Sequence, residues 1–441
     1  MDESIFKKYD IRGIYPEQIN EEVVYKICSG FLEFVKNFYN LKNPKIVIGY
    51  DIRESSEALK QIGIKALVEG GAEVIDIGLC STPLNYFANW QLKADASVMI
   101  TASHNPKQYN GMKIFLREVK ALSEIGALDK VKEISLKDDF QKAEGGSVKE
   151  IDVSDDYIEY IAKESKTTNF KIAIDCGNGM AGPLFEKLAK KIGINYKGLY
   201  MEPDGEFPNH SPNPLNEESL VSLRELMRQE EFDLGFVFDG DGDRLRILDS
   251  KGEAVKADYV IGIFAREFLS KSKKIVCDAR ISKGVREEIN RLGGEILRAP
   301  VGYPYIKKVM RKENCFLGGE MALHYFWQDF SYSESAILSL VRFLNILQGN
   351  TIEELKKPFE KYFSPGEINF KGIEDKKGKI KEIEKKYSDG EISHLDGLTV
   401  DYSNWWFNIR PSNTEPLLRL TIEARTKKLL DEKIEELKGL F

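Results

Sequence analysis

Three aspartates alternate with glycines in residues 238–244, which read FDGDGDR after the apolar stretch DLGFVF. Like charges about 4 Å apart repel by up to about 4 kcal/mol at an effective dielectric constant of 20, and a bound cation would relieve that repulsion. A solvated Asp-Gly turn is the alternative. Because an apolar strand leads into three crowded carboxylates, the pattern favours a hard divalent cation held by Asp239, Asp241 and Asp243.

An EF-hand loop also contains alternating aspartates, but it requires Gly at its sixth position, Glu at its twelfth and a helix on each side. Those positions hold Arg244 and Ser250 here, and the flanking segments have the composition of strands. An EF-hand is therefore excluded. Three carboxylates leave coordination positions open, which a water or a phosphate oxygen would fill if the ion is Mg²⁺.

A serine and a histidine follow another apolar stretch, ADASVMI, in the segment TASHNPKQYNG at 101–111. A serine hydroxyl needs a base or a metal to act as a nucleophile. The segment lacks the G-x-S-x-G pattern of a hydrolase nucleophile, so a hydrolytic triad is not indicated. Ser103 either caps a turn or carries a phosphoryl group whose oxygen completes the metal shell.

Two further segments contain side chains suited to phosphorylated sugars. RPSNTEPLLR at 410–419 sets hydroxyl and amide donors between two arginines, as a phosphate clamp requires, although a cap of a strand or helix is the alternative. GGEMALH at 318–324 offers Glu320 and His324 for sugar hydroxyls.

The elements around these motifs repeat. KIVIGYDIR (45–53), KIAIDCGNG (171–179) and KIVCDAR (274–280) each read as a strand that ends in an aspartate, and each precedes a helix and a second strand. Three such βαβ units predict parallel sheets covered by helices, which bind ligands at the carboxyl ends of their strands. Ser103 lies at such an end.

The C-terminal part has a different pattern. Residues 359–370 contain Pro and Gly and are expected to form a domain boundary, followed by a charged helix with Ile373, Ile380, Ile383 and Tyr387 on one face. Two strands, LTVDYSNWWFNIR and LLRLTIEAR, and a last helix predict a small α+β domain.

Length and composition limit the classes of protein. The 441 residues predict three or four domains, and 42% hydrophobic with 31% charged residues is typical of packed globular domains. A net charge of -7 argues against nucleic-acid binding. The N-terminal residues lack the apolar core of a signal peptide, and no apolar run is long enough for a membrane span. Five scattered cysteines, without C-x-x-C spacing, favour the reducing cytoplasm.

Taken together and in this order, the motifs resemble the α-D-phosphohexomutase superfamily, and more closely its phosphomannomutase/phosphoglucomutase branch. The similarity covers nearly the whole chain and rests on YDIRG (9–13), TASHNP, NPLNEESL (213–220), DGDGDR, GGEM and RPSNTEP. It implies four domains around a central cleft: three α/β domains with mixed sheets and a C-terminal α+β domain resembling the TATA-binding-protein fold. The expected divisions are 1–150 with the phosphoserine loop, 151–250 with the metal loop, 251–360 with the sugar loop and 361–441 with the phosphate loop.

The resemblance implies a reversible interconversion of hexose 1-phosphate and hexose 6-phosphate, with mannose or glucose as the sugar. Phosphate would pass through a phosphoserine and a hexose 1,6-bisphosphate, which also serves as activator, with one Mg²⁺ per chain. The implied partners are a phosphorylated hexose and, at most, a second copy of the chain, without nucleic acid or membrane. The implied metal ligands are Ser103, Asp239, Asp241 and Asp243, and the implied catalytic residues are Ser103, His104, Lys113, Arg12 and His324. The implied substrate contacts are Tyr9, Arg244, Arg280, Tyr303, Glu320, Arg410, Ser412, Asn413, Thr414 and Arg419.

Two residues depart from the family pattern. Relatives usually read GEMSGH where this chain has Ala322 and Leu323, so one hydroxyl is lost and a bulky apolar side chain enters. A phosphosugar-binding protein with weakened catalysis therefore remains an alternative, as does a metal-dependent phosphatase. Asn413 resembles the mannose and glucose branch, whereas a glycine there would indicate a phosphoglucosamine mutase, which also remains open.

Overall fold

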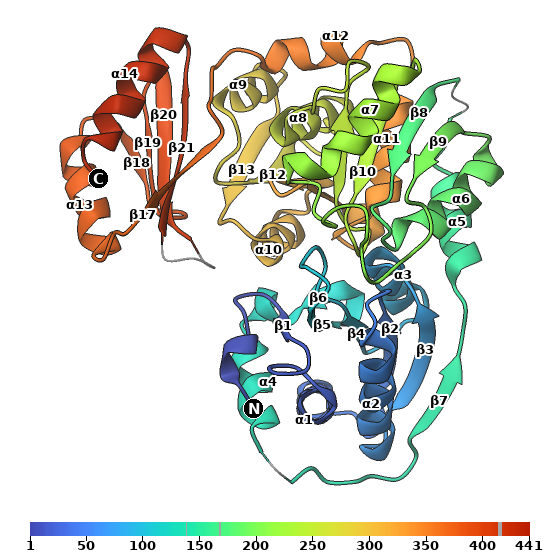
Figure 1. Cartoon of the computed structure of the whole chain (residues 1–441). Coiled ribbons are helices and arrows are strands. Elements are labelled where there is room, and N and C mark those ends of the chain that lie inside the picture. Colours follow the sequence, from blue (N-terminus) through green and yellow to red (C-terminus); the bar gives the residue numbers. More distant parts are fainter. Residues whose placement is uncertain (138, 167–168, 413–416) are drawn as a thin grey trace. The chain divides into compact units, whose positions relative to one another are not determined.

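The computed structural model describes residues 1–137, 139–166, 169–412 and 417–441. The chain forms two compact units, the first comprising Met1–Val255 with Ala322–Gln348 and the second Lys256–Met321 with Gly349–Phe441. Because the chain passes between them three times, neither unit is a single continuous segment. Figure 1 labels the helices and strands along the chain.

The first sheet of the first unit is mixed. Its strands are β1 (Ile11–Ile14), β2 (Lys45–Tyr50), β3 (Glu73–Leu79), β4 (Ala96–Ile100), β5 (Tyr109–Leu116), β6 (Lys120–Ala121) and β7 (Ser147–Glu150). They lie in the order β1-β5-β4-β2-β3-β7, and β6 pairs with β5. The pairs among β4, β2, β3 and β7 are parallel, whereas β5 is antiparallel to β4, β1 and β6.

Helices cover both faces of this sheet. They are α1 (Glu21–Tyr39), α2 (Ser56–Glu69), α3 (Thr82–Gln91) and α4 (Leu128–Ser135). Ile46 and Ile48 belong to the core that includes α1, α2 and α4, while α3 contacts β2 and β4. Side chains alternate along a strand, so Val47 faces the opposite side. Cover on both faces explains why every residue of β4 is buried and why its sequence ASVMI lacks polar alternation.

The second sheet of this unit has four strands: β8 (Lys171–Asp175), β9 (Asn195–Leu199), β10 (Leu234–Phe238) and β11 (Leu245–Leu248). They lie in the order β11-β10-β8-β9, with β8 parallel to β9 and β10, and β11 antiparallel to β10. The helices of this region are α5 (Ser154–Ala162), α6 (Ala181–Ile192) and α7 (Val221–Gln229). The short reversal between β10 and β11 is the aspartate segment.

Residues 322–348 return to the first unit. They form β15 (His324–Trp327), its antiparallel partner β16 (Ser333–Glu334) and α11 (Ala336–Leu347). Phe343 of α11 packs edge to face on Phe236 of β10, with ring centroids 6.5 Å apart. These residues are therefore part of the core that supports the aspartate segment.

The second unit begins with a parallel arrangement. Its strands β12 (Lys274–Asp278), β13 (Glu295–Ala299) and β14 (Leu317–Glu320) lie in the order β13-β12-β14. Its helices are α8 (Ala257–Phe268), α9 (Lys283–Arg291), α10 (Tyr303–Glu313) and α12 (Ile352–Lys356). The three predicted βαβ units, namely β2-α2-β3, β8-α6-β9 and β12-α9-β13, are all confirmed as parallel.

The C-terminal region folds as an antiparallel sheet with two helices. The elements are β17 (Glu367–Lys371), α13 (Lys376–Lys386), β18 (Glu391–Ser393), β19 (Leu398–Asp401), β20 (Trp405–Pro411), β21 (Leu417–Ala424) and α14 (Lys427–Lys438), with strand order β17-β21-β20-β19-β18. The predicted α/β and α+β classes are confirmed, while the likeness to the TATA-binding-protein fold stays a prediction.

Two details of the C-terminal prediction were wrong. The first predicted strand is two strands that turn at 402–404, and Ile373 precedes α13 instead of lying on it. The strands β17 and β18 were not expected, because each is short and mostly polar. Their places are fixed by pairing with β21 and β19.

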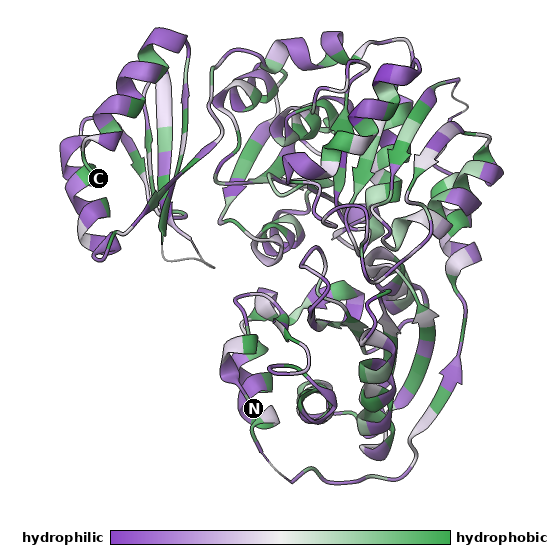
Figure 2. Ribbon diagram, viewed as in Figure 1, coloured by the Kyte–Doolittle hydropathy of each residue, from purple (hydrophilic) through white to green (hydrophobic). Residues whose placement is uncertain are grey.

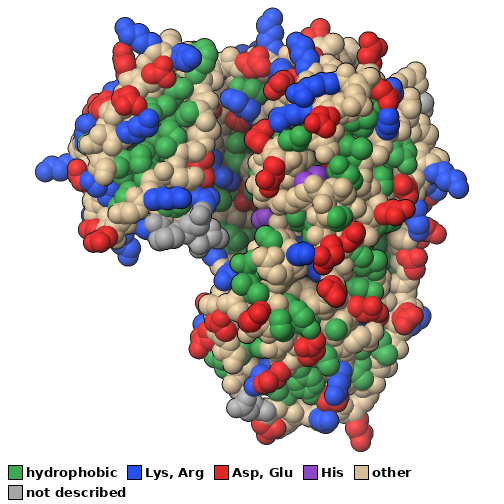
Figure 3. Space-filling view, in the orientation of Figure 1, with side chains coloured by type: hydrophobic (Ala, Val, Ile, Leu, Met, Phe, Trp, Pro, Cys, Tyr) green, Lys and Arg blue, Asp and Glu red, His purple; other side chains and the backbone are tan. Residues whose placement is uncertain are grey.

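Hydropathy and charge follow this architecture. The inner strands of the sheets are mainly hydrophobic, whereas α13 and α14 present hydrophilic residues (Figure 2). Acidic and basic side chains are interspersed over the face shown in Figure 3, as the modest net charge of -7 leads one to expect. Within the described ranges, no helix combines the length and the apolar character needed to cross a bilayer.

Candidate active site

Ser103 follows β4, at the carboxyl end of the parallel part of the first sheet. Its side chain is buried, and its φ of 53° lies in the left-handed region, which a non-glycine residue adopts only when its surroundings hold it there. The Ser103 Oγ lies 3.1 Å from Nδ1 of His104 and 3.4 Å from Oδ2 of Asp239. The two motifs singled out in the sequence therefore meet within the first unit.

The three aspartates of the segment after β10 converge. All are buried, and one ligand atom from each lies within 4.8 Å of the others. Gly242 has a φ of 76°, which permits the tight reversal between Asp241 and Asp243. Oδ1 of Asp239 accepts the backbone N–H groups of Asp243 at 3.0 Å and Arg244 at 3.1 Å, which fixes the segment from within.

Charge in this cluster is balanced from outside the segment. Lys113 of β5 donates to Oδ2 of Asp241 and to Oδ2 of Asp243, both at 2.6 Å. Burial and the neighbouring carboxylates of Asp243 and Asp241 raise the pKa of Asp239 well above its usual value. Burial acts to raise the pKa of Asp243 as well, but Lys113 and His324 outweigh it and hold that pKa well below the usual value.

His324, the first residue of β15, lies between a carboxylate and a guanidinium. Its Nε2 is 3.1 Å from Oδ1 of Asp243 and 3.0 Å from Nε of Arg244. A single ring nitrogen cannot donate to Asp243 and accept from Arg244 at once, so the proton on this nitrogen depends on how the neighbouring charges are neutralised.

The cluster fits a divalent cation. Oδ1 of Asp241 is buried and has no hydrogen-bond partner, whereas Oδ2 of the same carboxylate is fully engaged by Thr82 and Lys113. A buried anionic oxygen without a partner is costly, and three carboxylate oxygens within a few ångströms suit a hard cation. Asp239, Asp241 and Asp243 are thus able to hold a metal ion, with Ser103 beside them.

Two further predicted residues lie beside Ser103. Burial and the positive charge of Arg244 lower the pKa of His104 well below its usual value, so its imidazole is neutral at physiological pH. Arg12 donates to Oδ1 of Asn105 at 2.7 Å and is held by Asp10 through its Nε and Nη2. Tyr9 directly precedes Asp10. The Lys8 ammonium lies over the Tyr9 ring, and the Tyr9 carbonyl accepts a hydrogen bond from Ser123 Oγ.

The predicted phosphate-binding arginines converge in the second unit. Arg280 makes a two-point ion pair with Asp278, and its Nη1 lies 3.9 Å from Glu367. Arg410 and Arg419 lie 2.5 and 3.4 Å from the same carboxylate. Glu367, which was not predicted as a site residue, is the common ion-pair partner of the three guanidinium groups.

The remaining predicted residues of this unit are spread over several elements. Glu320 ends β14 and Tyr303 begins α10, and both are mostly buried. The N–H of Ser412 donates to the carbonyl of Leu417 at 3.0 Å. Asn413 and Thr414 lie outside the described residues.

Thr82 and Arg53 were missed by sequence reasoning. Thr82, at the start of α3, donates to Oδ2 of Asp241 at 2.5 Å through its hydroxyl and to the Asp241 carbonyl at 2.9 Å through its N–H. Arg53 donates to the carbonyl of Ser103 at 2.9 Å. Thr82 gave no usable signal, but the tetrapeptide YDIR, present at 9–12 and again at 50–53, was a signal for Arg53.

The two departures from the family pattern differ in exposure. Leu323 is 1% exposed, adopts a φ of 71°, and accepts a hydrogen bond from the N–H of Leu245 through its carbonyl. Its side chain is therefore packed inside the first unit. Ala322 is partly exposed and offers no hydroxyl.

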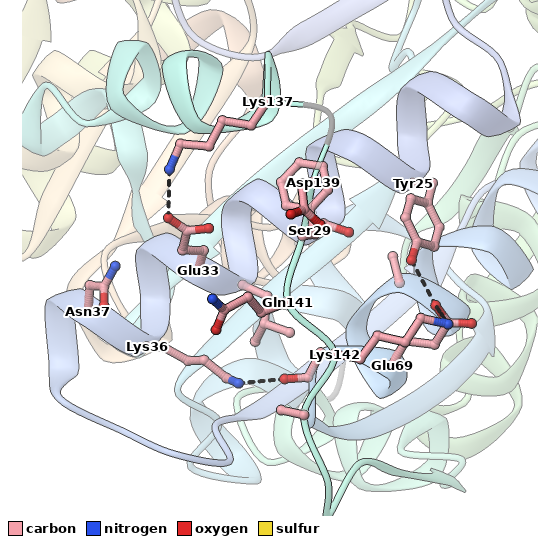
Figure 4. A pocket seen from close by; sticks show the side chains of 15 residues that line it. Tyr25, Ser29, Glu33, Lys36, Asn37, Glu69, Lys137, Asp139, Gln141 and Lys142 are labelled. Carbon is pink, nitrogen blue, oxygen red and sulfur yellow. Dashed lines mark hydrogen bonds and ion pairs between the residues drawn. The ribbon is translucent and has the colours of Figure 1, made fainter.

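A separate cavity of about 490 Å³ lies between α1, α2, Lys137 and residues 139–143 (Figure 4). Its lysines are engaged locally: Lys137 pairs with Glu33 at 2.9 Å, and Lys142 pairs with Glu69 at 3.1 Å. Lys36 donates to the carbonyl of Gly70 at 2.5 Å. Two of these three lysines are thus neutralised by carboxylates of the same cavity.

Comparison with known proteins gives one consistent result. Four family models match in succession: "Phosphoglucomutase/phosphomannomutase, alpha/beta/alpha domain I" at residues 3–142, domain II at 155–252, domain III at 256–362 and the C-terminal domain at 367–439. The chain is 37% identical to a phosphomannomutase of Methanocaldococcus jannaschii over 99% of this chain and 97% of that protein. It is 34% identical to one of Escherichia coli over 99% and 98%.

A solved structure agrees with these sequence matches. The crystal structure of a phosphoglucomutase/phosphomannomutase family protein from Burkholderia thailandensis superposes with a TM-score of 0.91 at 30% identity, covering 99% of this chain and 96% of that one. The chain belongs to the phosphoglucomutase/phosphomannomutase family of phosphohexomutases, which are intramolecular phosphotransferases.

Proposed function

We propose that the protein interconverts the 1-phosphate and 6-phosphate of a hexose, mannose or glucose, through a phosphoserine at Ser103 and a hexose 1,6-bisphosphate. The observation that carries this proposal is the approach of the Ser103 Oγ to Asp239, at 3.4 Å, in a cluster of three buried carboxylates. The relatives named phosphomannomutase supply the sugar class.

The reaction needs a phosphoryl group that leaves one oxygen and arrives at another. In the forward direction, the bond between phosphorus and the Ser103 Oγ breaks as a bond to a sugar hydroxyl forms, and the hydroxyl proton must be removed. In a second transfer, the bond between the sugar oxygen and the other phosphorus breaks as a bond to the Ser103 Oγ forms, and the sugar oxygen takes up a proton. Such in-line transfers are accelerated by positioning and by neutralisation of charge.

We assign the metal to Asp239, Asp241, Asp243 and an oxygen of the phosphorylated Ser103, with one Mg²⁺ per chain. When bound, the ion would neutralise charge on the transferring phosphoryl group. The unpartnered Oδ1 of Asp241 supports this assignment. Hexose 1,6-bisphosphate would load Ser103 and so act as activator.

Neighbouring groups divide the remaining tasks in this proposal. His104, 3.1 Å from the Ser103 Oγ and neutral, is placed to accept a proton, as is His324 in its unprotonated form. Lys113, Arg12 and Arg244 bring positive charge to the phosphoryl group.

The second unit would hold the phosphate that is not being transferred. We assign this role to Arg280, Arg410 and Arg419 with Ser412, Asn413 and Thr414, because guanidinium forks match phosphate oxygens. Tyr9, Tyr303 and Glu320 are proposed to contact the sugar and its phosphate.

We also propose four domains divided at 1–150, 151–250, 251–360 and 361–441, action in the cytoplasm, and a monomer or homodimer without nucleic-acid or membrane partners. Five buried cysteines and a net charge of -7 support the compartment and the absence of polyanion binding.

The test is an assay of mannose 1-phosphate and glucose 1-phosphate with Mg²⁺ and the matching bisphosphate. The wild-type protein should form the 6-phosphates, Ser103→Ala should form none, and Ser97→Ala should be active, since Ser97 is a buried serine of β4 bonded to Asn89. Release of free phosphate in proportion to substrate would indicate the phosphatase alternative. Binding without turnover would indicate a phosphosugar-binding protein. Including glucosamine 1-phosphate tests the phosphoglucosamine mutase alternative.

A further inference from the structure

The tetrapeptide YDIR occurs twice, and both copies contact the Ser103 loop, residues 101–109 between β4 and the start of β5. In each copy the arginine pairs with the aspartate two residues before it: Arg12 with Asp10 at 2.6 Å and Arg53 with Asp51 at 3.1 Å. The first copy precedes β1 and enters it, and the second ends β2, the strand next to β4. Only the first copy belongs to the motif that marks the family resemblance, so the second needs an account of its own.

Arg53 is buried and uses its whole set of donors. A guanidinium group carries five N–H bonds. Its partners are Asp51 Oδ2 for Nε at 3.1 Å, the carbonyls of Pro106 and Tyr109 for Nη1 at 2.8 and 3.0 Å, and the carbonyls of Ser103 and Asn105 for Nη2 at 2.9 and 2.7 Å. Four carbonyls of the Ser103 loop are thus held by one side chain that is 2% exposed.

The same ion pair also holds the N–H side of Ser103. Oδ2 of Asp51 accepts a hydrogen bond from Thr101 Oγ1 at 2.7 Å. Thr101 Oγ1 in turn accepts a hydrogen bond from the N–H of Ser103 at 2.8 Å. Ser103 is therefore fixed at its carbonyl and at its N–H while its φ is 53°. A strained backbone of this kind persists only where several contacts determine it.

We propose that Arg53 is a positioning residue for phosphoryl transfer: it holds Ser103 in the left-handed conformation that directs its Oγ toward Asp239 and His104. Arg53 itself makes its hydrogen bonds to Asp51 and to backbone carbonyls, so it acts through Ser103. The inference rests on the proposed role of Ser103 and deepens it.

A lysine cannot take over this task. Its ammonium group is a point charge with three donors, whereas the loop is held by a planar fork that reaches four carbonyls and a carboxylate. Because the aspartate cluster is held by Thr82 and Lys113, Arg53→Lys should leave metal binding intact while it misplaces the Ser103 Oγ. A displacement of about 1 Å at a reacting group costs on the order of 100-fold in rate.

The experiment compares Arg53→Lys with Arg342→Lys in the full chain. Arg342 is a matched control, because it is equally buried in the same unit, pairs with Asp329 through two bonds of 3.1 and 2.6 Å, and lies over the ring of Trp327. Three quantities are measured for each variant: the midpoint of thermal unfolding, the Mn²⁺ affinity of the unphosphorylated protein, in which only the three aspartates hold the ion, and the single-turnover rate of phosphoryl transfer from the loaded enzyme to hexose 6-phosphate.

For Arg53→Lys we expect a transfer rate and kcat lower by about 100-fold, with KM and Mn²⁺ affinity near those of the wild-type protein. Arg342→Lys should lose stability but keep its transfer rate. The inference is overturned if Arg53→Lys transfers phosphate at the wild-type rate, or if its transfer rate and Mn²⁺ affinity fall together.

A second variant covers the case in which Arg53→Lys does not fold. Asp51→Asn keeps the shape of the side chain and the whole of Arg53 but weakens the anchor of the guanidinium. It should lower the transfer rate by at least about tenfold, with normal Mn²⁺ affinity, and a wild-type rate would contradict the inference. If wild-type Ser103 takes up no phosphate at all, the proposed function fails instead, so the two failures are distinguishable.

Discussion

At the scale of residues, the site combines groups that a motif identifies with groups that only the fold brings near. DGDGDR and TASHNP indicated the aspartates and Ser103, because crowded carboxylates favour a cation and a serine at a strand end can carry the phosphate that completes its shell. Thr82 and Arg53 could not be assigned in this way. Thr82 contacts Asp241 and Arg53 contacts the Ser103 carbonyl, and both partners are distant in the sequence. A local sequence pattern does not indicate such long-range contacts.

Thr82 should increase the affinity of the aspartate cluster for a metal ion. Its hydroxyl engages Oδ2 of Asp241 and so directs Oδ1 toward the cluster. Removing a partner that orients a metal ligand typically weakens affinity by about 10-fold to 100-fold. We expect Thr82→Val to bind Mn²⁺ about tenfold more weakly by calorimetric titration.

Thr399→Val is the matched control, since Thr399 is a buried threonine that accepts a hydrogen bond from Asn408 in the second unit. Its Mn²⁺ affinity should equal that of the wild-type protein. Equal affinities for Thr82→Val and Thr399→Val would show that the hydroxyl does not orient Asp241.

At the scale of elements, the apolar strands of the three βαβ units were predictable and the short polar strands were not. Runs such as KIVIGY and KIAID are apolar because helices cover both faces of their sheets, so their composition alone identified them. Sequences such as EINFK and EIS carry no comparable signal. They are strands because β21 and β19 offer them unpaired edges.

The loop between β9 and α7 should stabilise the first unit in a pH-dependent manner. His210 lies 3.0 Å from Asp175 at the end of β8, and the nearby Pro212 carbonyl accepts the N–H of Gly240. Burial acts to lower the pKa of His210, but the hydrogen bond and charge of Asp175 outweigh it and raise that pKa. The protonated pair therefore stabilises the fold fully below the unfolded pKa of about 6.5, and this stabilisation is lost as pH rises through the folded pKa.

His210→Gln removes the titrating group but keeps a side-chain donor. We expect the wild-type protein to exceed this variant in denaturant midpoint most clearly near pH 5.5, and the difference to shrink as pH rises and His210 loses its proton. A difference that is constant across this range would show that the pair contributes no proton-linked stability.

Glu367 of β17 should compete with phosphate for the three arginines of the second unit. Its carboxylate lies 2.5 Å from Arg410 and 3.4 Å from Arg419, groups that we assign to a phosphate. Glu367→Gln removes the competing charge, so inorganic phosphate should bind more tightly, by roughly a few fold to tenfold for a pair that is partly exposed to solvent. Calorimetry or ligand-dependent thermal shift measures the change.

Asp401→Asn serves as the control for Glu367→Gln, because Asp401 pairs with Lys283 and Arg286 elsewhere in the same unit. It should leave phosphate affinity unchanged. Weaker phosphate binding by Glu367→Gln would instead mean that the carboxylate holds the arginines in place.

At the scale of the whole molecule, the four domains that follow one another along the chain do not coincide with the two compact units. Sequence motifs and family models place four domains in succession, and this order was predictable. The return of 322–348 to the first unit was not, because it depends on long-range packing such as that of Phe343 on Phe236.

A fragment that ends at Val255 should therefore be incomplete. Residues 1–255 alone lack β15 and α11, whose buried apolar side chains complete the core of the first unit, and β16, which pairs with β15. We expect this fragment to unfold without a cooperative transition by circular dichroism, and fusion of 322–348 through a flexible linker to restore one. A sharp transition for 1–255 alone would contradict the division.

The most direct test of the account is to follow phosphate on Ser103. The protein is incubated with hexose 1,6-bisphosphate and Mg²⁺, its intact mass is measured, the modified residue is mapped, and hexose 6-phosphate is then added. We predict a gain of one phosphoryl group on Ser103 that disappears at least as fast as the enzyme turns over, with the bisphosphate formed in equal amount. Phosphate on another residue, or phosphate on Ser103 that is not passed to the sugar, would contradict the account.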